Sequence, residues 1–130
     1  MFKSLLATTL LLSVSSFSCA ELTFSEKIRP TVQSLVNPQI DRLAIPPTPN
    51  QMSLPSFGKG VIGWGSGPEG AQQRLDTITA TDVLELKTKG VTLEMVQTWQ
   101  NFYENETRRN AGNPTAPLRA ALMQKITTLW

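Results

Sequence analysis

The sequence predicts an all-α protein, a small four-helix domain preceded by a glycine-rich loop and a proline-rich amino-terminal extension. Three observations support this prediction. Apolar residues recur at helical spacing in four segments after residue 66, each segment begins or ends at residues that typically cap helices, and alternating strand patterns do not compete with them. A short extended piece at Val61 and Ile62 is the one exception that the pattern allows.

Residues 1–20 have the pattern of an export signal. Lys3 supplies the positive amino end, an apolar run extends from Leu5 to Val14, and Ser18-Cys19-Ala20 supplies small residues for cleavage. We expect cleavage after Ala20 and a periplasmic or secreted mature chain without a transmembrane segment. Cys19 leaves a second interpretation open, a lipoprotein anchored through this cysteine, although Ser16 stands where such signals favour an aliphatic residue.

Residues 21–55 are predicted to form an extension that ends in a proline-rich linker. Pro30 and Pro38 interrupt any continuous helix, and the run Ile45-Pro46-Pro47-Thr48-Pro49-Asn50 favours an extended polyproline conformation. The helical domain is then expected over residues 56–130.

Six of the eight glycines lie between residues 57 and 70. The spacing Gly58-x-Gly60-x-x-Gly63 matches a dinucleotide-binding fingerprint, but no strand precedes it and no βαβ unit surrounds it, so it does not predict a nucleotide site. We interpret the segment as a tight irregular loop in which glycines adopt backbone angles that other residues avoid. The loop is expected to direct three apolar side chains into the core: Val61, Ile62 and Trp64.

Two short helices are expected after this loop. The first begins at Ser66-Gly67-Pro68, because proline is favoured in the first turn of a helix. Thr79 begins the second with a capping box that includes Asp82, and Gly90 ends it.

The longest helix is expected between Thr92, which caps its amino end, and Asn110. Glu106 lies in the middle of its apolar arc, where an unpaired carboxylate is unfavourable, so this residue must be paired, protonated or used. Asn113 or Thr115 is expected to cap a last helix, on whose inward arc Arg119 lies. The apolar arc of the longest helix consists of Met95, Val96, Trp99, Phe102 and Tyr103.

The composition excludes several classes of site. The chain contains no histidine, and its one cysteine lies in the predicted export signal, which excludes histidine-dependent catalysis, ordinary zinc sites and haem or iron–sulfur ligation. Since the acidic residues are scattered singly, we expect no metal and no cofactor. Without the signal the chain has eleven basic and ten acidic residues and no block of like charge, so no nucleic-acid binding is expected.

The polar residues around Glu106 allow two interpretations. In the structural one, Glu106 pairs with Arg119 and fixes the angle between the last two helices, while Asn110 and Asn113 hydrogen-bond within the turn. In the catalytic one, the apolar surroundings of Glu106 raise its pKa, and it acts as a general acid on a glycan. The predicted catalytic residues are Glu106 and Tyr103, and the predicted substrate-binding residues are Trp64, Trp99, Arg109, Asn110, Asn113 and Arg119.

Three motifs follow one another between residues 63 and 123. They are Trp64-Gly65-x-Gly67, Gly90-Val91-Thr92 and Phe102-Tyr103-x-x-Glu106-x-x-Arg109-Asn110-x-x-Asn113-Pro114-x-Ala116-x-x-Arg119. With them the segment from residue 63 to residue 123 resembles a small uncharacterised bacterial domain family. The resemblance implies a domain that occurs as a stand-alone exported protein and as the carboxyl-terminal cassette of polymorphic toxins. It implies no chemistry.

The function predicted from this setting is that of an exported effector-like domain that acts on the cell envelope. The most specific mechanism that the residues suggest for it is glycan cleavage by a glutamate general acid. Its partners would be peptidoglycan, an envelope protein or an immunity protein. The alternative is a non-catalytic periplasmic binding or structural module.

Overall fold

The computed structural model describes residues 34–130, so the predicted export signal, with Cys19 and the cleavage site after Ala20, lies outside the described residues. All regular elements of this part are helical, which confirms the predicted all-α class. None of its helices is long and apolar enough to span a bilayer. In chain order the elements are α2 (Leu54–Phe57), a π-helical turn η1 (Gly58–Ile62), α3 (Gly67–Thr77), α4 (Ala80–Thr88), α5 (Leu93–Arg109) and α6 (Ala116–Leu129).

The four predicted helices form with the predicted caps. The Thr92 hydroxyl accepts a hydrogen bond from the Met95 backbone N–H at 3.2 Å and begins α5. At the start of α4, Thr79 and Asp82 form the reciprocal capping box, with hydrogen bonds of 2.8 and 3.3 Å. Gly90 follows α4 with a φ of 89°, a left-handed angle that favours glycine.

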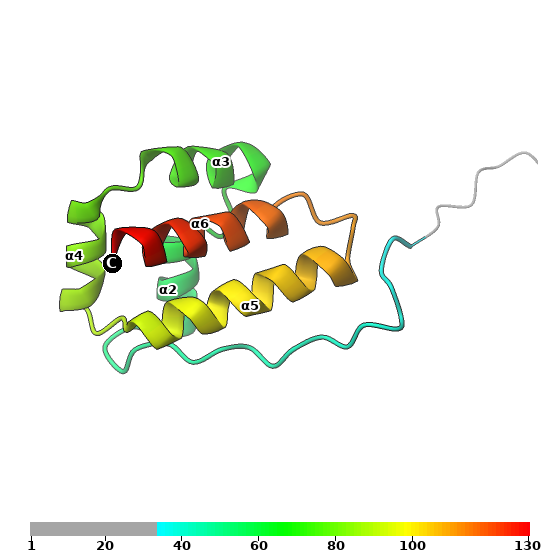
Figure 1. Ribbon diagram of the computed structural model, residues 1–130, viewed down its shortest axis with the longest axis horizontal. Helices are drawn as coiled ribbons and strands as arrows, with labels where there is room; N and C mark the ends of the chain where they lie inside the picture. Colours follow the sequence, from blue (N-terminus) through cyan, green and yellow to red (C-terminus); the bar gives the residue numbers. More distant parts are fainter. Residues whose placement is uncertain (1–33) are drawn as a thin grey trace, which may run out of the picture. The chain divides into compact units, whose positions relative to one another are not determined.

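Helices α5 and α6 lie side by side, and α3 packs on α6 (Figure 1). The apolar sides of α5 and α6 meet in the core, where Trp99, Leu122 and Ile126 are fully buried. Lys125 of α6 donates to the carbonyl oxygen of Leu75 at 2.7 Å and thereby holds α6 against the end of α3. The core thus lies beneath the longest helix, as its amphipathic pattern predicts.

The glycine-rich segment contains more helix than the sequence predicts. We expected an irregular loop from residue 57 onwards, with an extended piece at Val61 and Ile62, but α2 and η1 occupy residues 54–62 and only the residues after them form a turn. Gly58 supports this arrangement, because a Cβ atom at that position would overlap the indole ring of Trp64. The predicted left-handed angles do occur, at Gly63 with a φ of 90° and at Gly65 with a φ of 84°.

Residues 34–49, which we call the strap, make a turn at residues 38–39 and then run along α5 in an extended conformation and in the opposite direction (Figure 1). The Asn37 backbone N–H donates to the Arg109 carbonyl oxygen at 2.7 Å. Further along, the Asn105 amide donates to the Asp41 carbonyl oxygen at 2.9 Å, and the Trp99 indole donates to that of Pro47 at 3.2 Å.

The sequence predicts the extended conformation of the proline-rich part of the strap, from residue 45 onwards, but not its contacts with α5. An extended chain has backbone carbonyls without helical partners, and the buried donors on α5 require acceptors. The segment predicted as a linker is therefore bound to the domain, with Pro46 and Pro49 buried.

Candidate functional site

A cavity of about 380 Å³ lies between the strap, the turn after η1 and helices α5 and α6. Two strap residues mark its mouth, because the side chain of Arg42 is 61% exposed and Ile45 is 55% exposed. The cavity is lined by Arg42, Ile45, Trp64, Trp99, Phe102, Tyr103, Glu106, Asn113 and Arg119. Six of the eight predicted site residues are thus brought together, and Arg109 and Asn110 do not line the cavity.

Aromatic side chains form one wall of the cavity. The rings of Trp99 and Tyr103 stack with centroids 5.9 Å apart, and Trp64 meets Trp99 edge-on at 6.2 Å. The Trp64 indole N–H donates to the Tyr103 hydroxyl at 2.7 Å. Burial raises the pKa of Tyr103, so the phenol stays protonated and keeps its own hydrogen to donate.

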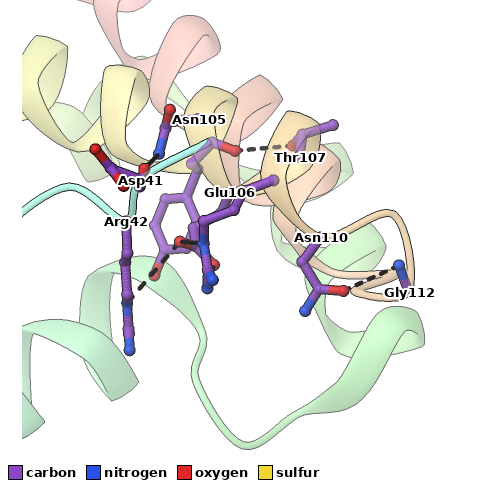
Figure 2. Close-up of polar contacts among 9 residues, drawn as sticks. Asp41, Arg42, Asn105, Glu106, Thr107, Asn110 and Gly112 are labelled. Carbon is purple, nitrogen blue, oxygen red and sulfur yellow. Dashed lines mark hydrogen bonds and ion pairs between the residues drawn. The ribbon is translucent and has the colours of Figure 1, made fainter. Parts of the chain in front are cut away.

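Glu106 forms a bidentate ion pair with Arg109, one helical turn further along α5. Arg109 Nε lies 2.8 Å from Oε1, and Nη2 lies 3.0 Å from Oε2. Arg42 reaches over from the strap, with its Nε 3.9 Å from Oε1 (Figure 2). The hydrogen bonds from Arg109 hold the pKa of Glu106 below its ordinary value, and the charges of Arg109 and Arg42 add to this effect against the opposing effect of burial.

The predicted ion pair between Glu106 and Arg119 does not form. Arg119 lies in the first turn of α6 and has no carboxylate partner within residues 34–130; its guanidinium carbon lies 5.8 Å from the centre of the Tyr103 ring. Arg109 pairs with Glu106 instead, because residues three apart on one helix are neighbours whatever the packing of the next helix. As a consequence the Arg119 Nε is buried without a hydrogen-bond partner among the described residues.

The two asparagines organise the turn between α5 and α6. The Asn110 side-chain oxygen accepts from the Gly112 N–H at 3.1 Å (Figure 2). The Asn113 side-chain oxygen accepts from the Thr115 N–H at 3.1 Å, from its hydroxyl at 2.8 Å and from the Ala116 N–H at 3.2 Å. Asn113, rather than Thr115, therefore caps α6, and its oxygen is not free to bind a ligand.

Sequence reasoning missed Arg42 and Ile45, because nothing in the residue pattern of the strap says which of its side chains turn toward α5. The cavity holds one carboxylate and several cationic and aromatic groups. Among residues 34–130 no cluster of His, Cys, Asp and Glu side chains is arranged to hold a metal ion. The arrangement is suited to binding a molecule through stacking and hydrogen bonds.

Comparison with known proteins gives a family match and a similar structure. A family model described as "Domain of unknown function (DUF4951)" matches residues 32–130. A solved structure described as "NMR structure of the protein from Acinetobacter baumannii" is similar over 80% of this chain and 94% of that one, with 48% sequence identity and a TM-score of 0.62. No curated protein matches the chain.

Proposed function

This chain belongs to the DUF4951 family of domains of unknown function. From the geometry of its cavity and the predicted export signal, we propose that it is a binding module for a component of the bacterial cell envelope. The protein would bind its ligand in the cavity beneath the strap without changing it chemically. This is the non-catalytic alternative that the sequence left open.

The observation that carries this proposal is the bidentate pair between Glu106 and Arg109. A general acid must hold a proton at the working pH, whereas Arg109 lowers the pKa of Glu106 and keeps the carboxylate ionised. Each carboxylate oxygen accepts a hydrogen bond from Arg109, which stabilises the anion and lowers its nucleophilicity toward a substrate. Glu106 is therefore better suited to fixing the Arg109 side chain at the carboxyl end of α5 than to catalysis.

The size and walls of the cavity support a small ligand. About 380 Å³ lies at the lower end of the range for small-molecule sites and fits a single sugar ring or a short peptide. Trp64, which is partly exposed and is supported edge-on by the buried Trp99, offers a flat apolar surface of the kind on which sugar rings and side chains pack.

Exposure to such a ligand depends on export, which the first twenty residues predict. The mass of the protein recovered from a bacterial host would test this directly: a chain that begins at Glu21 is expected. A chain that begins with a lipidated Cys19 would also place the module in the envelope, whereas a full-length chain confined to the cytoplasm would contradict the proposal.

Binding can be tested with soluble peptidoglycan fragments and the tryptophan fluorescence of the protein. Ile45→Trp would fill the mouth of the cavity, and we expect it to abolish the ligand-induced change. Leu43→Trp is the matched control, because Leu43 is another exposed strap residue that does not line the cavity. Equal binding by both variants, or no binding by the parent protein, would contradict the proposal.

The effector-like enzyme is a second candidate, because Glu106 and Tyr103 do line the cavity together. Its test is expression of the mature domain in the periplasm and in the cytoplasm of a test bacterium, beside a Glu106→Gln variant. Lysis or growth arrest that depends on Glu106 would support a toxin role of the kind that the resemblance to polymorphic-toxin cassettes implies. Under the binding proposal, neither version affects growth.

A further inference from the structure

The hydrogen-bond acceptors in the cavity wall already have partners. Both oxygens of Glu106 accept from Arg109. The side-chain oxygen of Asn113 accepts from three donors at the start of α6. A ligand that offers only hydrogen-bond donors would therefore find few acceptors among these side chains.

Two donors in the same wall lack an acceptor among residues 34–130. The Tyr103 hydroxyl accepts from Trp64, and within residues 34–130 its own hydrogen has no acceptor. The Arg119 Nε is buried, and among the described residues it has no hydrogen-bond partner. A buried donor without an acceptor is unfavourable, so a ligand that supplied an acceptor would recover this lost free energy.

The charges around the cavity favour an anion as that acceptor. Arg42 and Arg119 line the cavity beside one carboxylate, and this carboxylate is already paired with Arg109 outside the lining. The cavity and its edge thus hold three guanidinium groups, those of Arg42, Arg109 and Arg119, and one carboxylate. Guanidinium groups bind carboxylates and other planar oxyanions better than they bind neutral groups.

We propose that the cavity binds an organic oxyanion, with its oxygen atoms at Arg119 and Tyr103 and its carbon skeleton against Trp64. Arg42 covers the mouth and adds a second positive charge. This inference rests on the proposed function, since it names the chemical class of the ligand for the same site. Peptidoglycan contains such a group in the lactyl carboxylate of muramic acid wherever the stem peptide, which is otherwise joined to it by an amide bond, has been removed.

The test compares two probes that differ at the carboxylate alone: N-acetylmuramic acid, and its methyl ester, which has the same ring and lactyl group without the negative charge. We expect the acidic sugar to bind to the parent protein about tenfold or more tightly than the neutral one, as a charged hydrogen bond implies. N-acetyl-D-alanine and inorganic phosphate, added as competitors, show whether a different carboxylate or a phosphate serves equally well.

Arg119→Met should remove the preference for the acidic probe and leave the weak binding of the neutral one unchanged. Arg108→Met is the matched control: it removes the same charge from an exposed residue of α5 that does not line the cavity, and its effect should stay within about twofold. Tyr103→Phe removes the second donor and should weaken binding of the acidic probe in the same direction.

A measurement on the unaltered protein covers the case in which the variants do not fold. The Nε–H resonance of Arg119 in NMR spectra should shift when the acidic probe is added and stay in place with the neutral probe. Equal binding of both sugars would overturn the oxyanion inference and leave the binding module standing. Binding of simple carboxylates or phosphate but of neither sugar would support the oxyanion site and contradict an envelope sugar as its ligand. If no probe binds, both proposals fail.

Discussion

Glu106 shows how far a helical projection can identify a functional residue. The projection correctly places this carboxylate on the buried side of α5, where it is 6% exposed, and of the three alternatives that it leaves open the structure shows a paired carboxylate. It gives the wrong partner, because it shows the direction of a side chain but not the reach of an arginine that folds back along its own helix. Arg109 lies beside the apolar arc rather than on it, yet it makes both hydrogen bonds.

The lowered pKa of Glu106 predicts an acid-dependent loss of stability. Because the folded-state pKa is below the ordinary value of 4.5, the pair contributes its full stabilisation above that value and loses it as the pH falls through the folded pKa. Glu106→Gln should destabilise the protein at pH 7, by roughly 1–3 kcal/mol for a charged hydrogen bond, and much less at pH 3. Denaturant unfolding of both proteins at each pH measures the difference, and a constant difference would contradict this prediction.

Because Glu106 pairs with Arg109 and not with Arg119, we expect replacement of these two arginines to have different effects on the melting temperature. Arg109→Met leaves the Glu106 carboxylate without its bidentate partner and should lower the melting temperature, and the further change Glu106→Leu should restore much of the loss. Arg119→Met removes a guanidinium that has no carboxylate partner within residues 34–130, so it should leave the melting temperature nearly unchanged. If Arg119→Met lowered the melting temperature more than Arg109→Met does, the result would support the Glu106–Arg119 pair that the sequence predicts.

At the scale of elements, capping residues predict the helix starts well and glycine predicts local structure poorly. Thr79 and Thr92 begin α4 and α5 as their sequence patterns indicate, since each cap depends only on residues within one turn. Glycine disfavours helix, so residues 58–62 were expected to be a loop. Their π-helical geometry follows from a tertiary contact, the closeness of Trp64 to the Gly58 backbone, which no local pattern contains.

This contact predicts different results for two glycines of the same turn. Gly58→Ala would place a methyl group within the Trp64 ring, so the indole must move and its hydrogen bond to Tyr103 should be lost. Gly60→Ala is the control, because nothing lies within 4 Å of a Cβ atom there. We expect Gly58→Ala alone to destabilise the protein, by roughly 1–3 kcal/mol as for overpacking, and to weaken ligand binding. If the two variants unfolded at the same denaturant concentration, the result would contradict a close contact between Gly58 and the Trp64 ring.

For the chain from residue 34 to residue 130 as a whole, the main feature that the sequence does not reveal is the strap. Prolines correctly predict that residues 45–50 are extended, because they fix the backbone angle locally. The contacts of the strap depend on donors more than fifty residues away, on Trp99 and Asn105. Such pairings leave no periodic signal, and the two strap residues of the cavity, Arg42 and Ile45, were missed for the same reason.

The hydrogen bond from Asn105 to the strap predicts the rate at which trypsin cleaves after Arg42, because cleavage requires the strap to leave α5 locally. Asn105→Ala removes this bond, which contributes about 1 kcal/mol, and should raise the cleavage rate about fivefold. Asn101→Ala changes an exposed residue of the same helix and should leave the rate unchanged. Similar rates for the two variants would mean that the Asn105 bond does not hold the strap.

The strap also gives the molecule an order of folding. Only residues 110–115 separate α5 from α6, whereas the bonds of the strap to Trp99 and Asn105 close chain segments of 52 and 64 residues. Because closing a longer segment costs more chain entropy, we expect α5 and α6 to pair early and the strap to dock in a later step. Arg42 and Ile45 arrive with the strap, so the mouth of the cavity is completed last, and a refolding intermediate would have a packed helical core that cannot yet bind.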